Sequence, residues 1–264
     1  MTDLSRFDGK IAVITGAAQG IGEATARLLA RRGAAGLVLT DRQPEKLEAV
    51  AQSLREHLTV ETVVADLVNT EQLLQIIPAA EARFSRIDVL ANIAALTARG
   101  GILDTSLEQW DELFAANLRA PFALMQGALR VMERHAIQGT IVNILSVHAH
   151  GGAPFLTPYS TSKGALAILT RNVAHSVLRL GIRVNGINLG WTDTPGERAH
   201  HGERPQWMNE AARELPLGRL IEPDEVARLI AFLASGESGI MTGALLDFDQ
   251  SVIGTGGSPG LRWK

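Results

Sequence analysis

The stretch Ile11–Gly22, which reads IAVITGAAQGIG, joins a short apolar run to a turn that contains three glycines. The apolar run predicts a buried β-strand, and the helical periodicity from Ile21 to Arg32 predicts a helix directly after the turn. A second apolar run follows at 37–40, which completes a strand-helix-strand unit. Glycines at the first turn of such a unit allow backbone N–H groups to approach a pyrophosphate, although a glycine-rich turn alone is also compatible with an ordinary turn.

The same alternation continues along the chain and predicts the fold class. Seven strands are expected in all, because further apolar runs lie at 60–65, 87–91, 140–145, 182–187 and 244–248. Continuous apolar strands joined by helices indicate a parallel sheet that is covered on both faces and has right-handed crossovers. The sequence therefore predicts a doubly wound α/β fold with helices on both sides of the sheet.

Two segments interrupt this rhythm. The polar segment 191–219 predicts a lid over an active site, and the glycine-rich segment 254–264 predicts a C-terminal tail. No Pro/Gly/Ser-rich linker divides the remainder of the chain. Residues 1–253 are therefore predicted to form a single domain.

The composition excludes several classes of function. The chain has 264 residues, a formal net charge of −3 and no cysteine, which excludes disulfides, thiolate nucleophiles and cysteine-ligated metals. Its 25 lysines and arginines are scattered, which argues against a nucleic-acid partner. The polar start of the chain is unlike a signal peptide, and no apolar stretch is long enough to span a bilayer. We expect a cytoplasmic protein with a small-molecule substrate and no membrane partner.

Asp41 strengthens the nucleotide interpretation. It lies 19 residues beyond Gly22, at the end of the second predicted strand, where a carboxylate can accept hydrogen bonds from adenosine ribose hydroxyls. A 2′-phosphate at that place would be repelled, and the variable positions of the glycine turn, 17–19, hold no cation. NAD is therefore expected rather than NADP. Arg42 would weaken this preference, but it is equally well explained as a solvated surface charge.

The only tyrosine of the chain, Tyr159, stands four residues before Lys163, one of four lysines. In a helix this spacing places the phenol and the ammonium on the same face. A nearby ammonium favours the phenolate form. The pair is therefore interpreted as an activated acid/base.

With these motifs in order, the chain resembles the classical short-chain dehydrogenase/reductase family from about Lys10 to Asp249. The resemblance rests on the glycine turn, the Tyr159/Lys163 pair and Ser146, which precedes Tyr159 by the family's 13 residues. Further matches are Ala65-Asp66-Leu67, Asn92, and Asn117 within Phe114-Ala-Ala-Asn-Leu. The resemblance implies a single Rossmann-type domain with a seven-stranded sheet, NAD or NADP as cofactor, and a homotetramer or dimer.

The resemblance also implies roles for individual residues. Tyr159 would act as the acid/base, with Lys163 and the positive nicotinamide ring lowering its pKa from the usual value near 10. Ser146 would hold the substrate oxygen, and Asn117 would anchor a water that links Lys163 to solvent. The implied catalytic residues are Asn117, Ser146, Tyr159 and Lys163. The implied cofactor-binding residues are Gly16, Gln19, Gly20, Ile21, Gly22, Asp41, Arg42, Asp66, Leu67, Asn92, Ala94, Tyr159, Lys163, Thr192 and Thr194.

The chain departs from the family pattern at four places, none of which removes a catalytic group. Asn92-Ile93-Ala94-Ala95 stands for Asn-Asn-Ala-Gly, and Leu189-Gly190 stands for Pro-Gly. Asp249-Gln250-Ser251 replaces Asp-Gly-Gly near the C-terminus, and Leu145 replaces a frequent Ser. We expect the backbone contacts of the first loop and the contact of Thr194 with the carboxamide to persist.

Two histidine pairs, His148/His150 and His200-His201, raise the question of a metal site. No carboxylate or cysteine is spaced to complete such a site, so no metal is expected. His148, two residues beyond Ser146, is better placed to face a substrate. Trp191 either forms a wall of the same pocket or packs in the interior.

The pattern as a whole predicts an NAD-dependent oxidoreductase that converts a secondary alcohol to a ketone, or a cyclic hemiacetal to a lactone. Polar side chains in the lid suit a sugar or polyol, although a solvated surface explains them equally well; they are Glu197, Arg198, His200, His201, Glu203 and Arg204. Two alternatives stay open. Reduction of a 3-oxoacyl thioester is one, against which Asp41 counts, and a non-catalytic NAD-binding sensor or scaffold is the other.

Overall fold

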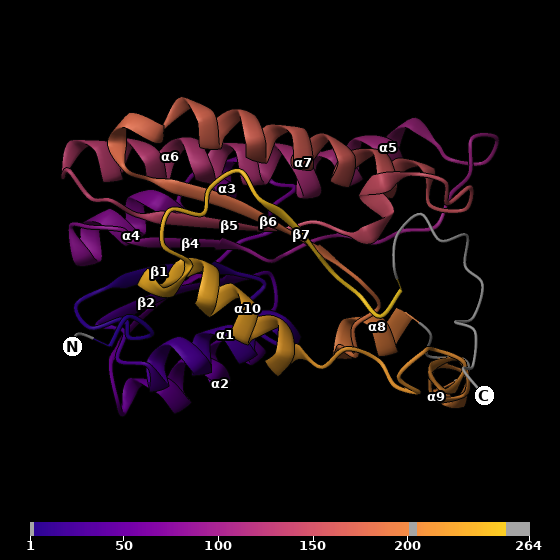
Figure 1. Ribbon diagram of the computed structural model, residues 1–264, viewed down its shortest axis with the longest axis horizontal. Helices are drawn as coiled ribbons and strands as arrows, with labels where there is room; N and C mark the ends of the chain where they lie inside the picture. Colours follow the sequence, from indigo (N-terminus) through magenta and orange to yellow (C-terminus); the bar gives the residue numbers. More distant parts are fainter. Residues whose placement is uncertain (1–2, 201–204, 252–264) are drawn as a thin grey trace.

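The computed structural model describes residues 3–200 and 205–251, in which a seven-stranded sheet forms the centre of the molecule (Figure 1). The strand order is β3-β2-β1-β4-β5-β6-β7, and every pair of neighbouring strands is parallel. The strands are β1 (Ile11–Thr15), β2 (Gly36–Asp41), β3 (Thr59–Val64), β4 (Val89–Asn92), β5 (Thr140–Ile144), β6 (Arg183–Leu189) and β7 (Leu245–Phe248). The order reverses direction at β1, between β2 and β4, which is where doubly wound sheets bind ligands.

Helices cover both faces of this sheet in two layers (Figure 1). One layer consists of α1 (Gly20–Arg31), α2 (Pro44–Arg55) and α10 (Pro223–Ala234). The opposite layer consists of α3 (Thr70–Leu73), α4 (Ile76–Phe84), α5 (Leu107–Phe114), α6 (Ala120–Arg134) and α7 (Thr157–Ser176). The short turns are η1 (Ala115–Arg119), η2 (Val147–His150), η3 (Leu178–Leu180) and η4 (Gly236–Ser238). The predicted doubly wound, Rossmann-type fold is confirmed.

Alternating side chains of the strands create two cores. In β1, Ala12 and Ile14 pack with α1, α2 and α10, whereas Val13 packs with the opposite layer. All five residues of β1 are buried, as expected for a strand with helices on both sides. The strands β4 and β5 are likewise fully buried, whereas the edge strands β3 and β7 are mostly only half-buried.

Asp88 fixes the amino-terminal edge of the sheet. Its side chain is only 2% exposed, and it accepts a hydrogen bond of 2.9 Å from the backbone N–H of Ile11. Arg86 and Lys10 pair with the same carboxylate at 2.7 and 3.3 Å. These bonds connect the beginnings of β1 and β4, at the opposite edge from the strand ends that carry the predicted site.

The predicted lid contains two short helices, α8 (Pro195–His200) and α9 (Pro205–Arg213). It has a small core of its own, in which Met208, Ala212 and Leu220 are buried against Trp191 and Leu215. The lid residues His201, Glu203 and Arg204 and the predicted tail 254–264 lie outside the described residues.

Gln250 connects the end of β7 to the base of the lid. Its side-chain oxygen accepts a hydrogen bond of 3.0 Å from the N–H of Leu217, and its amide nitrogen donates one of 2.5 Å to the carbonyl of Arg219. Gln250 stands where the family pattern has the first Gly after Asp. This departure therefore adds a tether between the lid and the sheet.

Candidate active site

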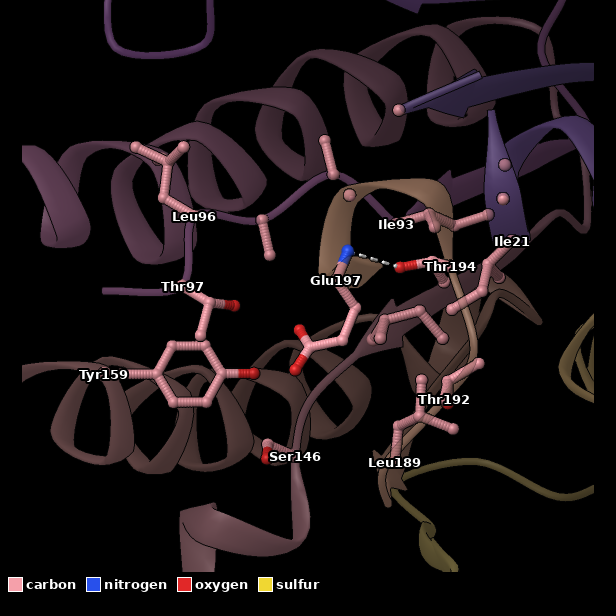
Figure 2. A pocket seen from close by; sticks show the side chains of 18 of the residues that line it. Ile21, Ile93, Leu96, Thr97, Ser146, Tyr159, Leu189, Thr192, Thr194 and Glu197 are labelled. Carbon is pink, nitrogen blue, oxygen red and sulfur yellow. Dashed lines mark hydrogen bonds between the residues drawn. The ribbon is translucent and has the colours of Figure 1, made fainter. Parts of the chain in front are cut away.

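A cavity of about 740 Å³ opens at the carboxyl edge of the sheet. Every predicted cofactor-binding residue lines it except Asn92, and so do the predicted substrate residues Ser146, His148 and Trp191. Figure 2 shows Tyr159, Thr97, Ser146 and Glu197 around one part of this cavity, with Ile21, Ile93 and Thr194 farther along it. The structure thus brings together residues that lie far apart in the sequence.

The glycine turn fits an anion at the start of α1. The helix begins after Gln19, whose side chain makes no capping hydrogen bond, so the first-turn N–H groups depend on other partners. Gly22 has no room for a side chain, because a Cβ there would lie 2.0 Å from the carbonyl oxygen of Gly16. This close packing lets the turn and the helix start form a compact backbone cradle for a pyrophosphate.

Thr15 connects the glycine turn to the loop after β4. Its buried hydroxyl accepts hydrogen bonds from the N–H groups of Ile93 and Ala94, at 2.9 and 3.0 Å. A Cβ on Gly16 would lie 3.1 Å from the backbone of Ala94. Thr15 was not among the predicted site residues, because its hydroxyl acts through a loop 78 residues farther along the chain.

Asp41 lies at the end of β2, as predicted, and its carboxylate is held by the backbone. It accepts hydrogen bonds from the N–H groups of Ala18 at 3.2 Å and Gln43 at 3.0 Å. Two cations stand close to this end of the cavity. Arg42 lines it, and Lys46 on α2 donates a hydrogen bond of 3.0 Å to the side chain of Gln19. The sequence prediction considered Arg42 but missed Lys46, which reaches the turn from the neighbouring helix.

Tyr159 and Lys163 lie on the same face of α7, with the ammonium nitrogen 5.9 Å from the centre of the phenol ring. The Lys163 side chain is 1% exposed, and its nitrogen donates a hydrogen bond of 2.8 Å to the carbonyl of Ile144. Burial lowers the pKa of Lys163 from 10.5 to about 7. Its ammonium therefore carries only part of its charge near neutral pH.

The pKa of Tyr159 differs from the sequence-based expectation. Burial raises it above 10.0, hydrogen bonds with Ser146 and Thr97 oppose the rise, and the charge of Glu197 adds to it. In the protein by itself the pKa of Tyr159 is therefore raised rather than lowered, because desolvation of the phenolate outweighs the two hydrogen bonds. The expected lowering also included the positive nicotinamide ring, whose charge acts only when the cofactor is bound. Thr97 was not predicted, and Glu197 was assigned only to the polar lid.

Ser146 faces Tyr159 from the loop after β5 (Figure 2). The serine is 4% exposed, and its oxygen accepts a hydrogen bond of 3.1 Å from the N–H of His148. Its hydroxyl hydrogen is thus left to donate to Tyr159 or to a substrate oxygen. The His148 ring lines the cavity, where burial lowers its pKa and the charge of Asp249 partly opposes this effect.

Asn117 and Asn92 stand behind the cavity wall rather than in it. Asn117 lies in the π-helical turn η1, and its amide bonds both the N–H and the carbonyl of Leu96, at 2.8 and 2.9 Å, and the Ser162 hydroxyl. The Asn92 side chain donates a hydrogen bond of 2.8 Å to Asn143 inside the sheet. These asparagines therefore shape the loop after β4, whose Leu96 and Thr97 line the cavity.

Within the described part of the chain, no group of three or more His, Cys, Asp or Glu side chains is arranged to hold a metal ion. The same residues contain no helix whose length and hydrophobicity would let it span a membrane.

The sheet order, the glycine turn and the side chains of Ser146, Tyr159 and Lys163 at one cavity define a nicotinamide-dependent oxidoreductase. The chain belongs to the classical short-chain dehydrogenase/reductase family. A family model described as enoyl-(acyl carrier protein) reductase matches residues 16–251.

Three individual proteins illustrate the range of the family. The 3-oxoacyl-[acyl-carrier-protein] reductase FabG of Thermotoga maritima is 33% identical over 251 residues, which cover 94% of this chain and 99% of that protein. A gluconate 5-dehydrogenase from Burkholderia cenocepacia, solved with NADP and tartrate, is 32% identical with a TM-score of 0.84, covering 94% and 96% of the two chains. L-sorbose reductase from Gluconobacter frateurii, solved with NADPH and L-sorbose, is 28% identical with a TM-score of 0.90, covering 96% and 100%.

Proposed function

We propose that this protein is an NAD-dependent dehydrogenase that interconverts a secondary hydroxyl of a sugar or polyol and the corresponding carbonyl or lactone. The observation that carries the proposal is the meeting of Tyr159, Ser146 and the buried Lys163 at the cavity that the glycine turn also lines. A hydroxyl acid/base, a second hydroxyl and a cation in one cleft are the groups that alcohol oxidation needs.

In the proposed mechanism, a bound nicotinamide ring would supply the hydride acceptor, or the donor in the reverse direction. Tyr159 takes the proton of the substrate hydroxyl, and Ser146 donates a hydrogen bond to the same oxygen as charge changes there. Lys163 would hold the ribose hydroxyls of a bound cofactor and, when protonated, favours the phenolate. Asn117 supports this arrangement by fixing Leu96 and Ser162. The raised pKa of Tyr159 means that additional positive charge beside the phenol would assist the reaction.

The preference for NAD is supported by Asp41. Its carboxylate is fixed at the cavity by two backbone N–H groups and would repel a 2′-phosphate. Arg42 and Lys46 are the residues through which NADP would be accepted, and two related structures were solved with NADP or NADPH. Measurement of kcat/KM with each cofactor tests this point, and a preference for NADP would overturn the role given to Asp41.

A polar substrate is supported by the groups around Tyr159. Thr97, Ser146, His148 and Glu197 all line the cavity and can exchange hydrogen bonds with several hydroxyl groups. Proteins named for gluconate and L-sorbose are among the related structures.

Reduction of a 3-oxoacyl thioester remains a second candidate, because Leu96, Phe155 and Leu156 also line the cavity and offer an apolar surface to an acyl chain. The FabG reductase of Thermotoga maritima has this activity in its name. A non-catalytic sensor or scaffold is the third, and it would require that the biological role survive loss of Tyr159.

The decisive experiment is to follow NADH or NADPH formation and consumption with a panel of sugars, polyols, hydroxy acids and a 3-oxoacyl thioester. Tyr159→Phe is the matched variant, since it removes only the phenol oxygen. Oxidation of a sugar or polyol with NAD, reduced about 100-fold or more in the variant, would support the proposal. Preferential turnover of the thioester would favour the second candidate, and equal rates of both proteins would exclude Tyr159 as the acid/base.

We also propose a cytoplasmic homotetramer or dimer. A groove of about 660 Å³ runs over α5, η1, α6 and α7, where Phe122 is 45% and Ile168 66% exposed. Burial of such apolar side chains is typical of subunit interfaces. Light scattering of the purified protein tests the assembly, with Ile168→Glu as the variant expected to weaken it.

A further inference from the structure

His150 is the member of the His148/His150 pair that the proposed chemistry leaves without a role. It is the last residue of η2, the 3₁₀ turn that directly follows Ser146. Its Nε2 atom lies 2.9 Å from Oδ1 of Asp247 on β7. The same nitrogen lies 3.3 Å from Nδ2 of Asn188. We assign the ring hydrogen to Nε2 from the shorter contact, because a carboxylate oxygen only accepts hydrogen bonds.

Asp247 is itself fixed by the sheet. It is the register partner of Asn188 on the neighbouring strand β6, and Asn188 donates a hydrogen bond of 2.7 Å to the same Oδ1 atom. Asn188 is buried, at 2% exposed, whereas the side chains of His150 and Asp247 are 42% and 44% exposed. Burial raises the pKa of the Asp247 carboxyl, but the hydrogen bonds from His150 and Asn188 and the charge of His150 outweigh it, so the pKa is lowered and the carboxylate stays ionised. The network connects the end of η2 to the last two strands.

At the other end of the same turn, the backbone N–H of His148 donates to the Ser146 oxygen. The first residues of η2 are therefore hydrogen-bonded to Ser146, and its last residue is hydrogen-bonded to Asp247 of the sheet. Gly151 and Gly152 follow with positive φ angles of 86° and 89°, and they offer no side chains for anchoring. His150 is thus the last side chain that can fix η2 before a glycine pair.

We propose that His150 and Asp247 are positioning residues that hold η2 against β7 and thereby set the positions of the Ser146 hydroxyl and the His148 ring. This inference rests on the proposed function for its catalytic consequence. Its structural part, the anchoring of η2, does not depend on turnover. Neither residue touches the reacting atoms, so both act through Ser146 and His148.

The test compares His150→Ala, Asp247→Ala and the double variant with the wild-type protein. Displacing a reacting group by about 1 Å can cost up to 100-fold, so we expect kcat to fall by about 10-fold in each single variant. The double variant should lose no more than about the same factor, because both substitutions break one connection. NADH binding, measured by fluorescence, should stay within about twofold, since the glycine turn and Asp41 are unchanged.

Two conservative variants distinguish positioning from general destabilisation. His150→Gln retains a donor at a similar reach, and Asp247→Asn retains an acceptor for Asn188, so both should recover most of kcat. His135→Ala is the matched control, because His135 also pairs with a carboxylate, that of Glu81 at 3.5 Å, but on the α4/α6 side away from the cavity. The control should leave kcat unchanged.

Hydrogen–deuterium exchange of the segment 146–150 gives a readout that needs no substrate. Faster exchange there in His150→Ala and Asp247→Ala, with unchanged exchange in β1, is the expected result. Normal exchange together with a kcat within twofold of wild type would overturn the proposal. If the wild-type protein shows no Tyr159-dependent turnover, the proposed function fails while the exchange experiment still decides whether η2 is anchored.

Discussion

Replacement of Lys163 by methionine should stabilise the cofactor-free protein, and the gain should depend on pH. The lysine nitrogen is buried and has the carbonyl of Ile144 as a hydrogen-bond partner at 2.8 Å. Its pKa falls from 10.5 to about 7. At about 1.4 kcal/mol for each pKa unit, this shift corresponds to roughly 5 kcal/mol of lost stability when the group is protonated in both states.

The sign follows from proton binding. Between about pH 7 and 10.5 the unfolded chain binds the lysine proton more strongly than the folded protein does, so this group makes stability rise with pH. Below about pH 7 both states are protonated and the full penalty applies. Methionine removes the penalty, so the advantage of Lys163→Met should be largest at low pH and disappear near pH 10.5.

Thermal unfolding of both proteins without cofactor measures this advantage. From about pH 6 to about pH 9 it should shrink by roughly 3 kcal/mol, or roughly 5 to 10 °C in the difference between the two Tm values. Lost packing and the lost bond to Ile144 add an offset that does not vary with pH. Lys46→Met, which removes an exposed ammonium on α2, is the control and should give a constant difference. A constant difference for Lys163→Met would refute the reasoning, and so would an advantage that grows with pH.

Three further outcomes are expected. Gly22→Ala should weaken NADH binding, titrated by fluorescence, by about 10-fold or more, because its Cβ would lie 2.0 Å from the Gly16 carbonyl oxygen and must displace the turn. Unchanged binding would contradict the role of the glycine turn in holding the pyrophosphate. Asp41→Asn should raise the ratio of kcat/KM with NADP to that with NAD by about 10-fold, since it removes the repelling charge and keeps an acceptor oxygen; a constant ratio would shift attention to Arg42. Asp88→Asn should lower the unfolding free energy by about 2 kcal/mol, because it weakens charged hydrogen bonds at the edge of the sheet opposite the cavity. NADH affinity should not change, and a loss of affinity would show that this edge is coupled to the cavity.

Much of the fold could be predicted because its evidence is local. The apolar runs marked all seven strands to within a few residues. The central strands are buried on both faces and tolerate few polar side chains, whereas the half-buried edge strands β3 and β7 include Glu61 and Asp247. The glycine turn and Asp41 were likewise recognisable from their distance to a strand end. The Tyr159/Lys163 pair needed only the helical repeat.

The remaining features of the site depend on contacts between distant segments. Thr97 lies in the loop after β4 and forms a hydrogen bond with Tyr159 on α7. No spacing rule connects these two residues in the sequence. The raised pKa of Tyr159 in the protein by itself could not be predicted, because charge proximity is visible in the sequence whereas the extent of burial is not. The hydrogen bond of the Asn92 side chain to Asn143 on the adjacent strand is a further contact that the sequence alone does not indicate.

The two ends of the lid are joined to one another. Thr192 and Ile221 form a parallel bridge, and the N–H of Asp193 donates a 2.8 Å hydrogen bond to the carbonyl of Ile221. With its own apolar core, the excursion between these residues leaves and re-enters the fold at a single place. Sequence changes inside this excursion can therefore leave the pairing of the strands intact, provided that they keep the contacts of Leu217 and Arg219 with Gln250. Because Thr192 and Glu197 also line the cavity, such changes alter what the cavity can hold without altering the order of the strands.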